Sequence, residues 1–339
     1  MEEIRSKAYA KVNIGLDVCG RRPDGYHFVN MVMQTVDIYD EICVRKLDSV
    51  QRPAGAGSTA EGSGAAGAAE SSEAAGAADS TRAAGAAGST KTASEDPGCD
   101  FPIRITSDRA GVPAGAENIA YKAAALVMKE CGISCPVEIN IKKNIPMAGG
   151  MAGGSTDAAT VLKAMNELFE CGLTQQDLDG LALKLGADVP FCLRQGTYLA
   201  QGIGEKLTKL KGLPQCAVLI ANPGFEVSTG WAYGQLDVPG FDAPHPDIDG
   251  LCAAIGTGEL DRICPKMGNL FETVVFPEHP ELENIKKTMQ SCGALAALMT
   301  GSGATMFGIF RSLPEARRAG EFLKRNTHLA FCQAAGFIS

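Results

Sequence analysis

The sequence contains little that would place it among nucleic-acid-binding or membrane proteins. Acidic residues outnumber basic ones by 39 to 31, and the pI is near 5.2. Proteins that bind nucleic acid by neutralising its phosphates carry a basic face or tail, so we expect no nucleic-acid partner. No uninterrupted apolar run reaches the roughly 20 residues of a membrane helix, and the first residues, MEEIRSKAYAKVNIGLDV, contain no apolar signal segment. We therefore expect a cytoplasmic protein with no membrane contact.

Metal-ligand patterns of cysteine and histidine are also missing. The chain has 12 cysteines and 4 histidines, but the closest cysteine pair, Cys131 and Cys135, has no second pair at zinc-ligand spacing. Scattered cysteines of this kind usually behave as small buried hydrophobic residues in a reducing compartment. We therefore expect free thiols and no zinc site.

Residues 51–98 lack Val, Ile, Leu, Met and aromatic residues altogether and consist mainly of alanine, glycine and polar residues. Such a segment cannot bury enough surface to offset the entropy lost on ordering. Its AAGAA repeats have no fixed period, which favours low complexity over a structural repeat. We expect a disordered insertion in a surface loop, which a fold tolerates because loop-closure entropy grows slowly with length.

The rest of the chain alternates between strand and helix patterns. With 339 residues, of which 45% are hydrophobic, it is long enough for two domains. Strand patterns next to hairpin patterns favour an α+β fold over a doubly wound parallel sheet. The expected elements at the start of the chain are strands at about 4–19 and 28–46, a helix at 118–131 ending at Gly132 and a strand at 137–141. A helix with Ser155 near its start and Gly172 past its end follows, and then one with Thr174 and Asp177 in capping-box-like positions that ends near Gly186. The remaining elements are a buried strand at 216–224, a helix at 282–293, two strands around a glycine turn at 294–310, and a final helix at 313–326.

The stretch PMAGGMAGGSTDAA at 146–159 joins a strand to a helix and has almost no side chains. Backbone amides in such a loop can approach an anion, and a helix N-terminus stabilises a negative charge by about 0.3 to 1 kcal/mol at an exposed site. We therefore expect it to bind a di- or triphosphate. The alternative is a tight turn with Ser155 as a helix cap, but four glycines exceed what a cap needs. Met151 and Ala152 stand where the P-loop and dinucleotide-binding patterns require glycine.

This loop resembles the second motif of the galactokinase, homoserine kinase, mevalonate kinase and phosphomevalonate kinase (GHMP kinase) superfamily. Three further stretches resemble, within it, the 4-diphosphocytidyl-2-C-methyl-D-erythritol kinase family: KAYAKVNIGLDVCGRRPDGYHFVNMVMQTVDIYDEI at 7–42, LGADVPF at 185–191 and MTGSGATMFGIF at 299–310. The resemblance runs nearly end to end except for the segment 51–98. It implies a two-domain GHMP kinase fold: a ribosomal protein S5 domain 2-like domain at 1–205 and a ferredoxin-like domain at 206–339.

The resemblance implies ATP-dependent phosphorylation of the 2-hydroxyl of 4-diphosphocytidyl-2-C-methyl-D-erythritol in the non-mevalonate isoprenoid pathway, by direct in-line transfer. The partners would be ATP and this cytidine diphosphate-linked substrate, on a monomer or weak homodimer. Mg²⁺ is expected because the charge of ATP must be neutralised, but no ligand to it is assigned. One alternative is a homoserine or mevalonate-type kinase, from which RPDGYH distinguishes the chain. Another is a non-catalytic nucleotide sensor, which would have lost Lys11 or Asp188, and both are present.

Two catalytic residues follow from the resemblance. Asp188 in GADVPF matches the aspartate that accepts or orients the proton of the substrate hydroxyl, and Lys11 in AKVN matches the lysine beside it. Without the surrounding motifs, Asp188 would be taken for a turn or cap residue and Lys11 for an exposed strand residue. Asn13 lies two residues after Lys11, on the same face of the strand, and would hydrogen-bond the substrate.

The remaining site residues are carried over from the same motifs. The methyl group of Ala152, where the family often has glycine, fits only if the φ of that residue is negative. The turn TGSGA at 300–304 would close the pocket from the C-terminal half, or form only a tight hairpin. The expected ATP-binding residues are Pro146, Met147, Ala148, Gly149, Gly150, Met151, Ala152, Gly153, Gly154, Ser155, Thr156, Asn118 and Lys143, and the expected substrate-binding residues are Asn13, Tyr26, His27 and Thr229.

Overall fold

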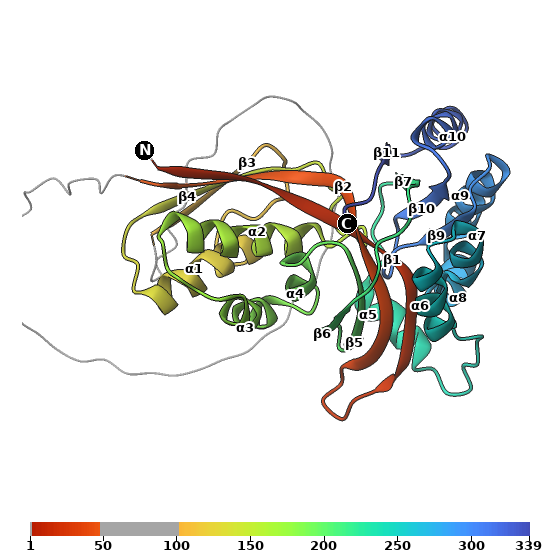
Figure 1. Ribbon diagram of the computed structural model, residues 1–339, viewed down its shortest axis with the longest axis horizontal. Helices are drawn as coiled ribbons and strands as arrows, with labels where there is room; N and C mark the ends of the chain where they lie inside the picture. The colour runs from red at the N-terminus through yellow and green to blue at the C-terminus, as the bar shows by residue number, and fades with distance from the viewer. Residues whose placement is uncertain (1, 48–101) are drawn as a thin grey trace, which may run out of the picture.

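The computed structural model describes residues 2–47 and 102–339, so the insertion predicted at 51–98 lies outside the described residues. Two β-sheets, each with helices packed against it, make up this part of the chain (Figure 1). The α+β class predicted from the sequence is confirmed.

The first sheet is built on a long antiparallel hairpin of β1 (Glu3–Arg21) and β2 (His27–Lys46). Its strand order is β3-β4-β2-β1-β8, and β5 and β6 extend it from the other half of β2. Their bounds are β3 (Ile103–Ser107), β4 (Val137–Lys142), β5 (Thr197–Gly202), β6 (Lys206–Lys209) and β8 (Gly268–Asn269).

Four helices of the described part of the chain lie beside the first sheet, and local sequence signals mark the ends of two of them. Asn118 caps α1 by accepting the amide of Ala120, and Gly132 ends the helix in the left-handed region. Thr174 and Asp177 form the predicted capping box at the start of α3. The helices are α1 (Ile119–Cys131), α2 (Gly153–Leu168), α3 (Gln175–Leu185) and the short α4 (Val189–Cys192).

The second sheet is wholly antiparallel, in the order β11-β7-β10-β9. Figure 1 shows α9 and α10 beside this sheet, and α6 to α8 beyond β1. The elements are β7 (Ala217–Asn222), α5 (Thr229–Leu236), α6 (Ile248–Thr257), α7 (Leu260–Ile263), α8 (Glu272–Glu278), α9 (Pro280–Ser291), β9 (Ala296–Met299), β10 (Met306–Phe310), α10 (Leu313–Asn326) and β11 (Phe331–Ala335).

One apolar core joins the two sheets, and another joins the first sheet to its helices. One cluster of buried residues combines Val12 and Ile14 of β1 with Val218 of β7 and Phe307 of β10. Another lies between the first sheet and helices α1 and α2. Burial of this kind contributes about 25 cal/mol per Å² of apolar surface removed from water. The shared core holds the loop after β9 against the loop after β4, which positions the site described next.

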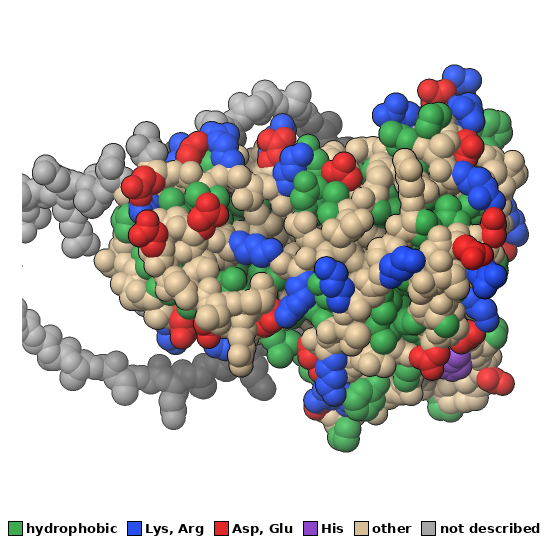
Figure 2. Space-filling view, in the orientation of Figure 1, with side chains coloured by type: hydrophobic (Ala, Val, Ile, Leu, Met, Phe, Trp, Pro, Cys, Tyr) green, Lys and Arg blue, Asp and Glu red, His purple; other side chains and the backbone are tan. Residues whose placement is uncertain are grey.

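The surface charges and the lengths of the helices can be compared with the expectation that the chain binds neither nucleic acid nor a membrane. Figure 2 shows acidic and basic side chains interspersed over one face. Within 2–47 and 102–339, no helix is both long enough and apolar enough to cross a membrane.

Candidate active site

A cavity of about 710 Å³ lies where β1, the glycine loop, the N-terminus of α2 and the loop after β9 meet. Most of the residues predicted to bind ATP or substrate line it. Met151 and Thr156 of the loop face elsewhere, as do Tyr26 and His27. The predicted residues that line the cavity are Lys11, Asn13, Asn118, Lys143, Pro146, Met147, Ala148, Gly149, Gly150, Ala152, Gly153, Gly154, Ser155, Asp188 and Thr229.

The glycine loop leads into a helix whose first amides are open. Ala152 occupies the N-cap position of α2 and provides no side-chain hydrogen bond to the amides of the first turn. Ser155, which the alternative interpretation made a cap, lies inside that turn. The first amides of a helix have no partner within the helix, and together with the helix dipole they form an anion site. Gly153 and Gly154 line the cavity, so these amides lie at its wall.

The expected backbone conformation of Ala152 is wrong. Its φ is +58°, in the left-handed region, and Ala148 in the same loop has a φ of +49°. That region costs a non-glycine residue about 1 to 2 kcal/mol, because Cβ approaches a carbonyl oxygen. The loop therefore keeps its curvature despite the alanines, and the surrounding contacts must compensate for the strain.

The close approach of the segment after β9 leaves no room for a side chain at two loop glycines. A Cβ on Gly150 would lie 2.2 Å from the carbonyl oxygen of Thr300, and one on Gly149 would lie 2.5 Å from Oγ1 of Thr305. The predicted turn at 300–304 therefore packs directly on the glycine loop, and its residues Gly301, Ser302 and Gly303 line the cavity. The turn therefore borders the pocket, as expected from the sequence.

Lys11 and Asp188 face each other at the cavity. The distance from Nζ of Lys11 to Oδ2 of Asp188 is 3.4 Å. Asp188 is the N-cap residue of α4, yet its side chain makes no capping hydrogen bond. The backbone of Asp188 lies in a turn, but its carboxylate caps nothing and is available to the cavity. The structure brings this predicted pair together.

Asn13 connects Lys11 to the second loop. Nζ of Lys11 donates to Oδ1 of Asn13 at 2.7 Å, and the backbone amide of Asn13 donates to Oγ1 of Thr300 at 3.0 Å. The register of β1 on β2 shifts between Tyr9 and Lys11 and again after Asn13. Such irregularities redirect side chains and are frequent beside active sites.

Thr229 borders the cavity from the other half of the chain. It is the first residue of α5, and its hydroxyl hydrogen-bonds that of Ser302 at 2.9 Å. Both residues line the cavity, so this bond ties α5 to the loop after β9.

Tyr26 and His27 lie in different environments. Tyr26 is 62% exposed and is not part of the cavity wall. His27 contacts the carboxylate of Asp237 through Nε2 at 2.9 Å and stacks on the ring of Tyr233 at 4.6 Å between centroids. Tyr233 lines the cavity and packs edge-on against Phe271. The structure thus connects His27 to the cavity through Tyr233 and leaves Tyr26 in solvent.

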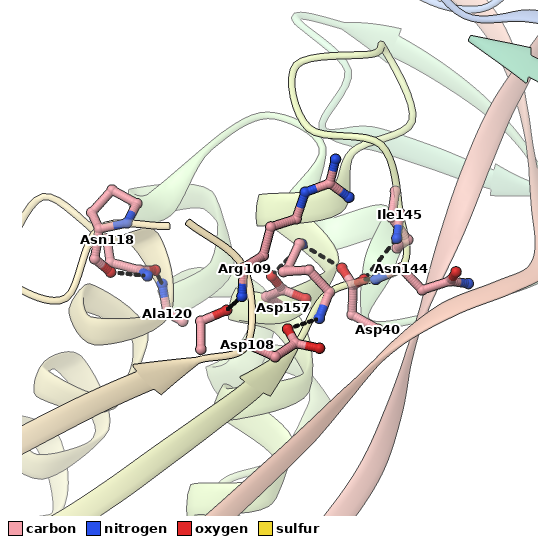
Figure 3. Close-up of polar contacts among 11 residues, drawn as sticks. Asp40, Asp108, Arg109, Asn118, Ala120, Asn144, Ile145 and Asp157 are labelled. Carbon is pink, nitrogen blue, oxygen red and sulfur yellow. Dashed lines mark hydrogen bonds and ion pairs between the residues drawn. The ribbon is translucent and has the colours of Figure 1, made fainter. Parts of the chain in front are cut away.

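Asn118 and Lys143 also have partners within the protein. The side chain of Asn118 donates to the carbonyl oxygen of Pro113 at 2.7 Å and accepts the amide of Ala120 at 2.8 Å. The ammonium of Lys143 pairs with the carboxylates of Asp40 and Asp157. Figure 3 shows Asp40 beside Asn144 and Ile145, just before the glycine loop, with Asp157 close to it.

Several residues that shape the site could not be recognised from the sequence. Tyr233 carries a phenol whose pKa is raised to about 12 by burial, to which the charge of Asp188 adds. It lies in the stretch TGWAY at 229–233, so an aromatic residue close to Thr229 was the available signal. Asp40 and Asp157 had no such signal, because a single aspartate in a strand or helix is most often exposed.

The cavity joins three features that phosphoryl transfer requires. Open amides can hold phosphate oxygens, a lysine can stabilise negative charge, and a carboxylate can orient an acceptor hydroxyl. All three border the same volume, on elements that the folded chain brings together. The arrangement can bind a nucleotide and a second small molecule together.

Comparisons with known proteins agree with this geometry. Models of the GHMP kinases N terminal domain and of the GHMP kinases C terminal domain match residues 118–196 and 249–328. The chain is 38% identical to a 4-diphosphocytidyl-2-C-methyl-D-erythritol kinase of Lachnospira eligens, over 96% of this chain and 95% of that protein. It is 39% identical to a protein of the same name from Clostridium perfringens, over 95% of this chain and 93% of that protein.

A solved structure is similar to this chain over nearly its whole length. It is the crystal structure of a 4-(cytidine 5'-diphospho)-2C-methyl-D-erythritol kinase, with a TM-score of 0.72 and 28% sequence identity. The similarity covers 99% of this chain and 100% of that chain. Both sheets and all walls of the cavity therefore fall within the region of similarity.

Proposed function

The chain belongs to the 4-diphosphocytidyl-2-C-methyl-D-erythritol kinase family of the GHMP kinases, and we propose on this basis that it transfers the γ-phosphate of ATP to the 2-hydroxyl of 4-diphosphocytidyl-2-C-methyl-D-erythritol. The products are ADP and the 2-phosphate of the substrate. The reaction serves the non-mevalonate route to isoprenoid precursors, and we place it in the cytoplasm, on a monomer or weak homodimer.

One observation carries the proposal. Lys11 and Asp188, 3.4 Å apart, border the same cavity as the open amides of α2. Phosphoryl transfer needs little covalent chemistry from the protein, so alignment and charge stabilisation account for most of the rate. A triphosphate held by the glycine loop would present its terminal phosphorus towards the region between these two side chains.

Asp188 is the proposed base or orienting group. It would accept a hydrogen bond from the 2-hydroxyl, and it would take the proton as the bond to phosphorus forms. The side chain of Asp188 is 30% exposed and that of Lys11 is 5% exposed. The carboxylate therefore meets the substrate, while the covered ammonium would stabilise the charge that develops on the attacking oxygen.

Mg²⁺ is proposed as a companion of ATP. Among the described residues, no group of three or more His, Cys, Asp or Glu side chains could hold a metal ion. Mg²⁺ usually keeps several waters and is bound by one or two carboxylates plus substrate phosphates. The cavity fits this mode, in which the nucleotide carries the ion, and it does not fit an all-protein cage. The ion would neutralise phosphate charge.

The cytidine end of the substrate is assigned to the part of the cavity near Tyr233. The ring of Tyr233 offers an apolar face, stacks on His27 and packs against Phe271. Aromatic stacking of this kind suits a nucleobase. Thr229 and Asn13 supply polar groups nearby. Tyr26 would have to move to take part, because it is largely exposed.

An acceptor panel tests the proposal. Purified protein with ATP and Mg²⁺ should release ADP when the cytidylylated methylerythritol is added, and it should show at most background release with homoserine or mevalonate. Turnover of homoserine or mevalonate in place of the cytidylylated acceptor would assign the chain a different substrate. ATP binding without turnover of any acceptor would favour a nucleotide sensor.

A further inference from the structure

We propose that Asp40 is a positioning residue for the nucleotide: through Lys143 and Asp157 it fixes both ends of the glycine loop in the conformation that receives the phosphates. The inference rests on the proposed function, because it concerns the ATP half of that site. Asp40 is fully buried and Asp157 is 4% exposed, and the side chain of Lys143 is 5% exposed. Figure 3 shows Asp40 and Asp157 close to each other and near Asn144 and Ile145, the residues just before the loop.

Asp40 holds the chain just before the loop. The ladder between β2 and β4 ends at the pair Glu41 and Lys142. Beyond it, Oδ1 of Asp40 accepts the backbone amides of Asn144 at 2.6 Å and Ile145 at 2.8 Å. A side chain of β2 thus replaces the missing strand partner and directs the chain out of the sheet and into Pro146. Two hydrogen bonds from backbone amides to one charged carboxylate oxygen fix this direction more firmly than hydrogen bonds to a neutral acceptor would.

Lys143 connects this anchor to the far end of the loop. Its ammonium donates to Oδ2 of Asp40 and, at 2.8 Å, to Oδ2 of Asp157, which lies in the second turn of α2. The loop at 146–152 therefore starts and ends at residues joined by one ammonium group. The backbone amide of Lys143 also donates to Oδ1 of Asp108 at 2.9 Å, which adds the segment after β3 to the same cluster.

The charges show that the cluster is not optimised for stability alone. Two carboxylates share one ammonium, and Oδ1 of Asp157 is buried without a hydrogen-bond partner in the described part of the chain. Burial raises the pKa of Asp157, and the charge of Asp40 raises it further against the opposing attraction of Lys143. Well-packed apolar residues often replace buried ion pairs at no cost in stability. A role in holding one loop conformation explains why charged groups occupy this place.

Asp40→Asn tests the inference. The amide keeps the size of the side chain but replaces one acceptor oxygen with an NH₂ group. That group faces either the ammonium of Lys143 or the two backbone amides, so one of these two sets of hydrogen bonds is lost. We expect the Kd of a non-hydrolysable ATP analogue with Mg²⁺, measured by calorimetry, to rise at least tenfold, with a parallel rise in the KM for ATP. The KM for the cytidylylated acceptor should stay within twofold of the parent value.

Glu41→Gln is the matched control. Glu41 is the next residue of the same strand, and its ion pair with Lys142 is exposed to solvent. This variant should bind the analogue as the parent does. An Asp40→Asn protein that binds the analogue within twofold of the parent overturns the inference, as does an equal loss for the analogue and the acceptor.

Asp157→Asn and Lys143→Arg cover the case in which Asp40→Asn does not fold. Asp157→Asn leaves the anchor at Asn144 and Ile145 intact, so the Kd of the analogue should rise by a smaller factor. Lys143→Arg keeps the charge and should bind the analogue more tightly than Lys143→Met. Equal binding by these two Lys143 variants contradicts the inference. If the parent itself does not bind the analogue, the proposed function fails as well. If the parent binds it and every variant matches the parent, the inference alone fails.

Discussion

Lys11 and Asp188 meet across the cavity with 3.4 Å between Nζ and Oδ2, although one lies in the first strand and the other after the third helix. Lys11 is also fixed by its hydrogen bond to Asn13 and by the bond from its own backbone amide to the carbonyl oxygen of Met151 at 3.2 Å. The pair is therefore tied to the loop that would hold the nucleotide. A shift of that loop would move both the phosphate and the lysine.

Asp188→Asn should lower kcat by about 10²-fold or more and leave ATP affinity near the parent value, because the amide cannot accept the proton but fills the same space. Steady-state kinetics with the cytidylylated acceptor, together with calorimetric binding of an ATP analogue, measure the two effects. Asp261→Asn serves as the control, since Asp261 pairs with Arg311 at an exposed position outside the cavity. A fully active Asp188→Asn enzyme would remove this residue from the mechanism.

Gly150→Ala should lower the free energy of unfolding by about 2 kcal/mol or more, because the added methyl group would overlap the carbonyl oxygen of Thr300 and the φ of +74° disfavours alanine. Gly180→Ala is the control: this glycine lies within α3 and a Cβ there meets nothing within 4 Å, so the change should be neutral or stabilising. Urea denaturation measures the free energy of unfolding of both variants. Equal stabilities would show that the two loops do not pack as described.

Ala152→Gly should raise the free energy of unfolding by up to about 1 kcal/mol, because glycine adopts the φ of +58° without strain. The same substitution at Ala158, a buried position inside α2, should instead lower it by about 1 kcal/mol or more. Thermal and urea denaturation measure both. A destabilised Ala152→Gly protein would contradict the left-handed conformation.

The elements that the sequence predicted well are those with local signals. The capping box of α3, the C-cap of α1, and the buried strand β7 all depend on residues within one segment. The helices α5 and α6 and the strands β5 and β11 were not predicted, because their sequences alternate weakly and their burial depends on elements far away in the chain.

The site residues also divide into those with a local sequence signal and those that depend on distant parts of the chain. The glycine loop, Lys11 and Asp188 belong to recognisable motifs, and the structure brings them to one cavity. The partners of Lys143 could not be predicted, since Asp40 lies in another strand and only the folded sheet brings the two together. The φ of Ala152 was expected to be negative because residue type alone argues against the left-handed region, and packing of the loop overrides that preference.

The carboxylate of Asp157 should make stability depend on pH. Burial raises its pKa from 3.8 to about 8; the attraction of Lys143 lowers it and the charge of Asp40 raises it. The folded chain keeps a proton that the unfolded chain has released, so the contribution of this group is fully present below about pH 3.8 and is lost as the pH rises through about 8. Relative to Asp157→Asn, the parent should become less stable from about pH 5 to 9, by at most about 1.4 kcal/mol per pH unit. Urea denaturation of both proteins across this range measures the effect. A difference in the free energy of unfolding between the parent and Asp157→Asn that does not change with pH would contradict the prediction.

A crystal structure with a non-hydrolysable ATP analogue, Mg²⁺ and the cytidylylated acceptor tests the central claim most directly. The account predicts phosphate oxygens within hydrogen-bond distance of the first amides of α2, and the acceptor 2-hydroxyl between the terminal phosphorus and Asp188, with Lys11 alongside. A triphosphate bound away from Gly153 and Gly154, or an acceptor hydroxyl that does not contact Asp188, would contradict it.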